Sequence, residues 1–172
     1  MARNVEIKAH LSADDLERVR KAAVARSSRA PELLHQRDTF YSVPCGRLKL
    51  RHFRDGGAEL IAYERPDRAG PKTSSYIRSP CADEQSLDEA LRRSVGLRGV
   101  VEKRREVIYV GQTRVHLDEV AGLGRFLELE VVLADGQDVE EGQRIALKLM
   151  DAFEIKPESL VEEAYVDLLE AT

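Results

Sequence analysis

Apolar and charged residues alternate over much of this chain, most clearly in the segment from Val101 to Leu133. Glu128 and Glu130 stand there between aliphatic residues at positions 127, 129, 131 and 133. Successive side chains of a strand point to opposite faces of a sheet. A strand at this place therefore carries two carboxylates on one face and only aliphatic side chains on the other.

Two more strands with one charged face each are predicted just upstream. Arg114 and Asp118 alternate with Val115 and Leu117, and Lys103 and Arg105 belong to a third alternating run. Any one of these faces, taken alone, is typical of a sheet surface that points to water. Three in succession leave a second interpretation open, in which the charged faces share one interior.

The same period-2 pattern and the turn residues predict strands at 4–11, 33–42, 47–51, 59–65, 72–79, 105–110, 113–120 and 126–133. Capping-box spacings, such as Ser12 with Asp15, and apolar residues at helical intervals predict helices at 12–26, 83–95 and 138–153. A short terminal helix is predicted after Pro157. Because the chain has no repeat, low-complexity tract or long linker, residues 1–172 are predicted to form one domain.

These elements predict an α+β fold built on a closed or nearly closed, antiparallel, eight-stranded β-barrel. Helices packed outside would cover the aliphatic strand faces and leave a charged lumen. Such a lumen would be costly if dry, so it needs water or a charged ligand. The residues predicted to face it are Glu6, Lys8, Lys49, Arg51, Lys103, Arg105, Arg114, Asp118, Glu128 and Glu130.

Composition narrows the choice of partners. Charged residues make up 34% of the chain and the net charge is -4, so no general attraction to nucleic acid or to an anionic membrane is expected. No stretch reaches the roughly 20 apolar residues of a membrane span, and the start lacks the apolar core of a signal peptide. A cytoplasmic location is therefore predicted, with Cys45 and Cys81 as free thiols.

The mixture of charges in the predicted lumen indicates the kind of ligand. Many cations beside a few carboxylates suit a polyphosphate that carries a hard divalent cation, either Mg²⁺ or Mn²⁺. Glu6, Glu128 and Glu130 are the candidate metal carboxylates. The chain has no P-loop, no G-x-S-x-G motif and no zinc-type spacing of histidines.

Several motifs carry a resemblance to a known family. They are Asn4-Val5-Glu6-Ile7-Lys8, Arg37-Asp38-Thr39-Phe40-Tyr41, Gly46-Arg47-Leu48-Lys49-Leu50-Arg51, Val101-Glu102-Lys103-Arg104-Arg105, and Leu117 to Gly124 leading to Glu128-Leu129-Glu130. With these motifs the chain resembles the CYTH superfamily over nearly its whole length. This superfamily of triphosphate tunnel enzymes includes class IV adenylyl cyclases, thiamine triphosphatases and inorganic tripolyphosphatases. The last two motifs look most like the cyclases.

The resemblance implies roles for individual residues. It implies catalytic roles for Glu6, Lys8 and Asp118, and metal binding by Glu6, Glu128 and Glu130. The resemblance also implies that several basic residues bind phosphate. They are Lys8, Lys49, Arg51, Lys103, Arg105, Arg114 and, on a weaker match, Arg65. Arg37 is added as a candidate phosphate ligand, with a surface position as the alternative. One departure matters, because Asn4 stands where the family motif has its first Glu.

Two classes of function follow. The leading hypothesis is a divalent-metal-dependent enzyme that acts on a small-molecule triphosphate, by cyclising ATP or by hydrolysis. The alternative is a module that binds a polyphosphate or a phosphorylated metabolite without turnover. Asn4 keeps this alternative open, because it stands in place of the first Glu of the family motif. A plain structural protein is the third hypothesis, and it requires the charged faces to point outward. A homodimer through a sheet edge or the terminal helix is a further expectation.

Overall fold

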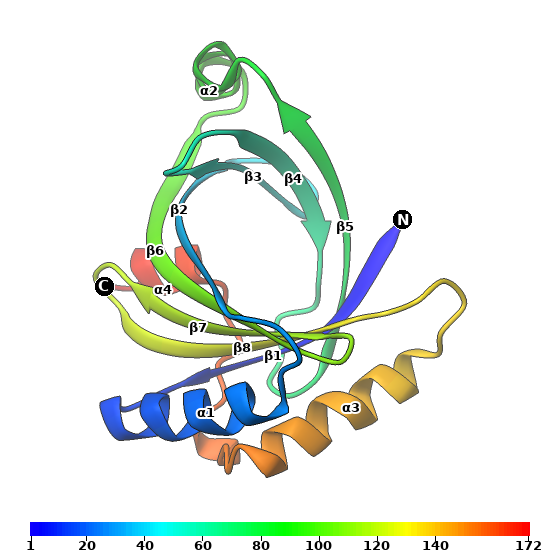
Figure 1. The fold of residues 1–172 in the computed structure, drawn as a ribbon. Coiled ribbons are helices and arrows are strands. Elements are labelled where there is room, and N and C mark those ends of the chain that lie inside the picture. The colour runs from blue at the N-terminus through cyan, green and yellow to red at the C-terminus, as the bar shows by residue number, and fades with distance from the viewer.

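The computed structural model describes residues 1–172, and a closed antiparallel barrel in the strand order β1-β5-β4-β3-β2-β6-β7-β8 dominates it. The strands are β1 (Ala2–His10), β2 (Glu32–Tyr41), β3 (Arg47–Phe53), β4 (Ala58–Glu64), β5 (Lys72–Cys81), β6 (Leu97–Val110), β7 (Thr113–Val120) and β8 (Gly124–Val132). Figure 1 looks into this barrel. The predicted α+β class, the closed eight-stranded barrel and the helices outside it are confirmed.

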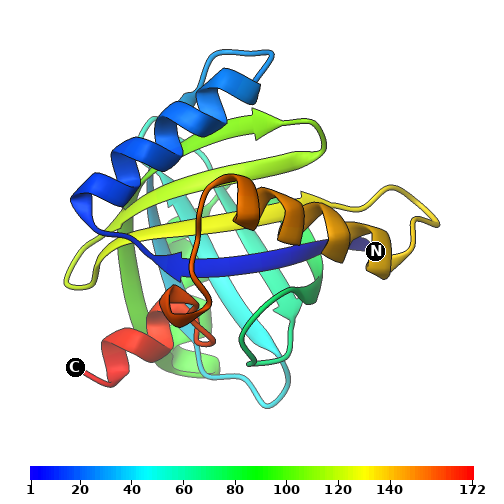
Figure 2. The ribbon, with the colours of Figure 1, turned by 90° about the horizontal axis from the view of Figure 1, so that it is seen from below.

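Two long helices cover one side of the barrel. α1 (Ala13–Arg26) and α3 (Val139–Ala152) lie beneath the sheet formed by β1, β8 and β7, as Figures 1 and 2 show from two directions. The aliphatic faces of these strands meet the helices in the largest apolar core, which includes Ile7, Val19, Leu129 and Leu149. The inward faces are left for the charged side chains.

Local sequence signals explain where the helices begin. Ser12 caps α1 in a reciprocal capping box with Asp15, as the spacing predicts. α3 approaches β1 and β8 at Gly142, where an added Cβ would lie 2.6 Å from Leu133 and 2.8 Å from Val5. Glycine therefore allows the close packing of this helix on the barrel.

The remaining helices are shorter. α2 (Glu84–Ser94) contacts β3 and lies beside the outer side chain of Tyr41, whose hydroxyl donates to Asp88. α4 (Tyr165–Glu170) contacts β6. No helix of the structure is both long enough and apolar enough to cross a membrane.

Two boundaries differ from the sequence-based predictions. β6 begins at Leu97 instead of residue 105, because residues 97–107 pair with β2. The predicted terminal helix is largely extended: a 3-10 turn (Pro157–Ser159) precedes residues 160–164, and only α4 is helical. β1 pairs with β5 only as far as Glu6, and beyond that point the extended residues bond to it: the Val161 amide donates to the Lys8 carbonyl at 2.9 Å.

Candidate functional site

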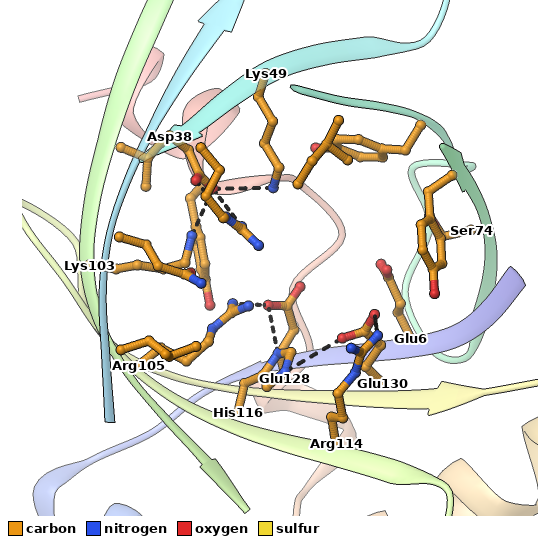
Figure 3. Close-up of a pocket in the computed structure, with 18 of the residues that line it drawn as sticks. Glu6, Asp38, Lys49, Ser74, Lys103, Arg105, Arg114, His116, Glu128 and Glu130 are labelled. Atoms are coloured by element: carbon orange, nitrogen blue, oxygen red, sulfur yellow. Dashed lines mark hydrogen bonds and ion pairs between the residues drawn. The ribbon is translucent and has the colours of Figure 1, made fainter. Parts of the chain in front are cut away.

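The barrel encloses a polar cavity of about 360 Å³, lined by inward side chains from all the strands (Figure 3). The prediction that the charged strand faces share one interior is therefore confirmed, and the exposed-surface interpretation is wrong for these residues. The predicted site residues that line the cavity are Glu6, Lys8, Lys49, Arg51, Arg65, Lys103, Arg105, Arg114, Glu128 and Glu130.

One part of the lumen is a cluster of cations around a single carboxylate, that of Asp38. Arg51 donates from Nε and Nη2 to the two Asp38 oxygens, each at 2.7 Å. Lys103 Nζ lies 2.8 Å and Lys49 Nζ 3.2 Å from Asp38 Oδ2. One acid therefore faces three cations, which leaves the cluster with an excess of positive charge.

Burial and ion pairing shift the pKa values of this cluster in opposite directions. Asp38 is only 1% exposed, and burial by itself would raise the pKa of its carboxyl; Arg51 and Lys103 outweigh burial and hold that pKa well below its usual value. Burial lowers the pKa of Lys103 to about 7, although Asp38 acts in the opposite direction. An anionic ligand placed here would restore the charged form of the lysine.

A second group connects Glu128 to the C-terminal segment. Arg105 donates to both oxygens of Asp118 at 2.7 Å, and its Nη2 also donates to Glu128 at 2.7 Å. The Tyr165 hydroxyl donates to Asp118 Oδ2 at 2.7 Å. Asp118 is fully buried and lies behind Arg105, outside the cavity lining. The two hydrogen bonds to Asp118 orient Arg105. We therefore propose that Asp118 acts by positioning Arg105, in place of the predicted direct catalytic role.

The carboxylates of β1 and β8 stand side by side. Glu6 is directly opposite Glu130 in the β1–β8 register, and Lys8 is opposite Glu128. Burial raises the pKa of the Glu6 carboxyl, and the negative charge of Glu128 raises it further. Arg65 partly offsets this with a 3.1 Å hydrogen bond to Glu6. Like charges converge here, at a place where a bound cation would be stabilising.

Glu130 has neighbours that differ in charge. Arg114 donates to it at 2.8 Å, Asn4 Nδ2 donates to the same oxygen, and His116 Nε2 lies 3.5 Å from its other oxygen. Several buried polar atoms around it have no hydrogen-bond partner: Asn4 Oδ1, His116 Nδ1, Arg114 Nε, and Arg65 Nε and Nη2. Buried donors and acceptors of this kind are normally satisfied, so these atoms are available to a ligand or to water in the lumen.

The C-terminal segment closes part of the lumen. Lys8 Nζ donates to the Glu163 carbonyl at 3.1 Å and lies 4.0 Å from the centre of the Tyr165 ring. Lys72, which is 1% exposed, donates to the Glu162 carbonyl at 2.6 Å. Burial lowers the pKa of Lys8 to about 8, with Glu128 opposing the shift.

One predicted ligand is misplaced. Arg37 is exposed on the outer wall of β2, because Gln36 and Asp38, its neighbours in the chain, are the inward members of the strand. Arg37 therefore does not line the lumen, and the surface position named as its alternative is the one observed. Conversely, Asp38 and Tyr165 belong to the site, although the sequence analysis predicts no site role for either. Asp38 has one sequence signal, its place in the Arg37–Tyr41 motif, and Tyr165 has no such signal.

The residues around Glu6 and Glu130 can be compared with the ligands that a divalent cation requires. No group of three or more His, Cys, Asp or Glu side chains is arranged to hold a metal by itself. Glu6 and Glu130 nevertheless lie opposite each other, with the unpartnered oxygen of Asn4 on the same strand. Mg²⁺ is commonly held by one or two carboxylates while phosphate oxygens and waters complete its octahedron. The residues present fit a cation shared with a phosphate ligand.

The sequence matches the CYTH domain family over residues 2–165, and the chain therefore belongs to this family. It is 24% identical, over 123 residues and 69% of each chain, to a protein of Methanocaldococcus jannaschii named a putative adenylate cyclase. The PH1012 protein of Pyrococcus horikoshii has a similar fold, with a TM-score of 0.83 at 21% identity over 96% of this chain and 98% of that one.

A third comparison concerns a plant protein. The structure of a putative adenylyl cyclase from Hippeastrum, described as revealing a dominant triphosphatase activity, has a TM-score of 0.69 at 14% identity. The match covers 99% of this chain and 96% of that chain. At this identity the likeness establishes a shared fold, and the reaction of this chain is a separate question.

Proposed function

We propose that this chain is a divalent-metal-dependent enzyme that acts on a triphosphate group held inside the barrel. The observation that carries the proposal is the pairing of two unlike clusters in one closed lumen. Lys49, Arg51 and Lys103 gather around Asp38 with excess positive charge, and Glu6 and Glu130 converge on the adjacent strands β1 and β8. Cations to grip phosphates and acids to hold a metal are the parts that phosphoryl transfer requires.

The division of labour follows from the geometry. Lys49, Arg51 and Lys103 would bind phosphate oxygens at one end, and the unpartnered donors of Arg65 and Arg114 would bind them near the carboxylates. Glu6, Glu130 and Asn4 Oδ1 would hold Mg²⁺ or Mn²⁺, with Glu128 beside them. The ion supplies positive charge against the phosphate oxygens. Arg105, oriented by Asp118, would stabilise charge that develops during the reaction.

Apolar and aromatic side chains in the lining of the cavity could contact the organic part of the substrate. Leu34, Phe53, Tyr76 and Tyr109 also line the cavity, and such side chains suit a base or another ring system better than a phosphate. This favours a triphosphate ester over inorganic tripolyphosphate. Cyclisation of ATP, in which the ribose 3'-hydroxyl attacks the α-phosphorus, and hydrolysis by water at the terminal phosphorus are the two reactions that the site could support.

Product analysis separates these reactions. The full chain is incubated with ATP, thiamine triphosphate or tripolyphosphate, each with Mg²⁺ or Mn²⁺, and the products are resolved by chromatography. Cyclic AMP with pyrophosphate identifies cyclisation, whereas a diphosphate with phosphate identifies hydrolysis. Turnover that is lost on chelation and restored by metal supports the proposal, and no turnover of any substrate contradicts it.

The phosphate cluster makes one prediction. Arg51→Ala is expected to weaken binding of tripolyphosphate by about 10-fold to 100-fold, because one charge-assisted contact contributes about 1.5–3 kcal/mol. The fold should survive, since Lys49 and Lys103 still neutralise Asp38. Calorimetric titration measures the affinity, and Arg93→Ala on the exposed face of α2 is the control for lost charge. Equal affinities of the two variants would show that Arg51 does not contact the ligand.

A second candidate function is binding of a polyphosphate without turnover, and Asn4 is the residue that favours it. Asn4 offers an oxygen at the metal end but no negative charge, so the cation would be held less strongly than by a third acid. This function predicts that tripolyphosphate binds equally well after chelation of metal. It also predicts no product from any triphosphate.

Asn4→Glu is expected to lower the concentration of Mn²⁺ that gives half-maximal turnover by about tenfold, since it adds a carboxylate beside Glu6 and Glu130. Titration of activity with Mn²⁺ at saturating substrate measures the change. Asn4→Ala, which removes the oxygen, is expected to raise the same concentration. A metal requirement that is identical in both variants and the wild type would remove Asn4 from the metal site.

A further inference from the structure

The outer wall of the barrel carries a hollow of about 770 Å³ that is separate from the lumen. It lies on β2, β3 and β6 and reaches the turn between β7 and β8. On β6 it falls between Arg98, which pairs with Glu170 at the end of α4, and Glu106, which pairs with Arg20 of α1. Apart from Lys103, which also lines the lumen, its basic lining residues are His35, Arg37, His52, Arg54, Arg104 and Arg125.

The strand register places these basic side chains directly opposite one another. His35 is the cross-strand partner of Arg104, and Arg37 is the partner of His52. The backbone of Arg54 is hydrogen bonded to that of His35 at 3.0 Å, which adds a third basic residue to the same row. The register therefore gathers two arginines and two histidines in adjacent positions, with Arg54 beside them.

The structure itself supplies little counter-charge. The guanidinium groups of Arg37, Arg54 and Arg125 form no hydrogen bond or ion pair, and Arg104 has only a 3.8 Å contact with Glu119. His52 Nδ1 lies 3.7 Å from Glu84, while its Nε2 is buried without any partner. Glu102 and Glu119 are the acids on this wall. Glu102 is the cross-strand partner of Arg37 and Glu119 that of Arg104, but both acids are exposed and only Glu119 contacts an arginine.

This gathering is unusual in a chain whose net charge is -4. Two exposed arginines elsewhere, Arg78 and Arg93, are paired with Glu59 and Glu89. A concave surface of several hundred cubic ångströms is also the shape of a small-molecule site. Unpaired guanidinium forks and an unpartnered imidazole nitrogen are donors that match phosphate oxygens in geometry and charge.

The geometry points to a second anion site on this outer wall, which binds the phosphate or diphosphate group of a small molecule outside the tunnel. Arg37 and Arg104 form its centre, and Arg54 and Arg125 bind from the rim. The proposal is independent of the reaction in the lumen. The two sites share β2 and β6, however, because Gln36 and Lys103 line both the hollow and the lumen.

Inorganic pyrophosphate is the probe. Amide NMR of the full chain, together with calorimetry, is used to follow its titration. Residues 35–37, 52–54, 102–104 and 124–125 are expected to shift with an affinity of their own. Arg37→Ala/Arg104→Ala should weaken this binding at least about tenfold, since each lost charge-assisted contact is worth about that factor. The shifts of Glu6 and Glu130 should be unchanged by the double variant.

The control is Arg93→Ala/Arg144→Ala, which removes the same charge from exposed positions on α2 and α3 and should bind as the wild type does. Arg51→Ala is the converse variant: it should weaken binding of pyrophosphate in the lumen and leave its binding in the hollow unchanged. The proposal is overturned if amides of the hollow do not respond to pyrophosphate, or if the double variant binds it like the control. A response to single-stranded RNA alone would overturn the small-molecule assignment.

Discussion

Glu128→Gln is expected to reduce turnover of the triphosphate substrate by about 100-fold or more while the barrel stays folded. Glu128 stands beside the proposed metal carboxylates, and its charge is held by Arg105 at 2.7 Å and Lys8 at 4.0 Å. Electrostatic stabilisation by a bound metal is worth several kcal/mol, and each 1.36 kcal/mol is a factor of ten in rate. Glutamine keeps the shape of the side chain and removes only the charge.

Steady-state kinetics at saturating Mn²⁺ measure the loss. Glu17→Gln on the exposed face of α1 is the matched control and should be fully active. Circular dichroism and thermal unfolding confirm that both variants are folded. Full activity of Glu128→Gln in a folded protein would exclude a role for this carboxylate in the reaction, and the metal end of the lumen would have to be assigned to other residues.

Asp38→Asn is expected to have the largest effect on stability, a loss of about 3–5 kcal/mol. That is the usual cost of removing one partner from a buried ion pair, because the opposite charges remain without compensation. Three cations depend on this one carboxylate, which is 1% exposed. Chemical denaturation gives the free energy of unfolding, and Asp135→Asn in an exposed turn should change it little.

The same substitution makes a prediction about the ligand. Without the Asp38 charge, tripolyphosphate becomes the main counter-ion of Lys49, Arg51 and Lys103. Since a ligand stabilises the folded state in proportion to the logarithm of its binding, it should raise the midpoint of thermal unfolding more in Asp38→Asn than in the wild type. A smaller rise in the variant would mean that the phosphate does not bind this cluster.

The stability difference between wild type and Asp38→Asn should also depend on pH in a defined direction. The pKa of Asp38 lies well below its usual value in the folded protein. A carboxylate of this kind contributes its full stabilisation above its unfolded pKa of about 3.9 and loses it as pH falls through the folded pKa. The difference should therefore be largest between about pH 5 and 6 and shrink in acid, where Asp38 is protonated. It should also shrink in part as pH rises through about 7, where Lys103 loses its charge. A difference that grows as pH falls below about 4 would contradict this assignment.

Glu128 and Asp38 differ in how much of their role can be predicted from the sequence. Glu128 was predicted to face a charged interior because it alternates with aliphatic residues, and that alternation depends only on neighbours along the chain. The strand that carries Asp38 lacks a clear alternation, so the sequence does not predict which of its faces points inward. Nor does it predict that Asp38 is the shared anchor of three cations, since Lys103 is 65 residues away in the chain. Such a contact depends on which strands become neighbours.

The sequence by itself therefore determined the number and order of the strands, the starts of α1, α2 and α3, the barrel class and the identity of most lumen side chains. These follow from periodicity, caps and turns, which are local. Only the tertiary structure decided that Arg37 lies outside, that Tyr165 from the C-terminal segment hydrogen bonds Asp118, and that Asp38 unites cations from β3 and β6. The physical reason is that barrel closure and strand register bring distant residues together, and no local pattern encodes the resulting partners.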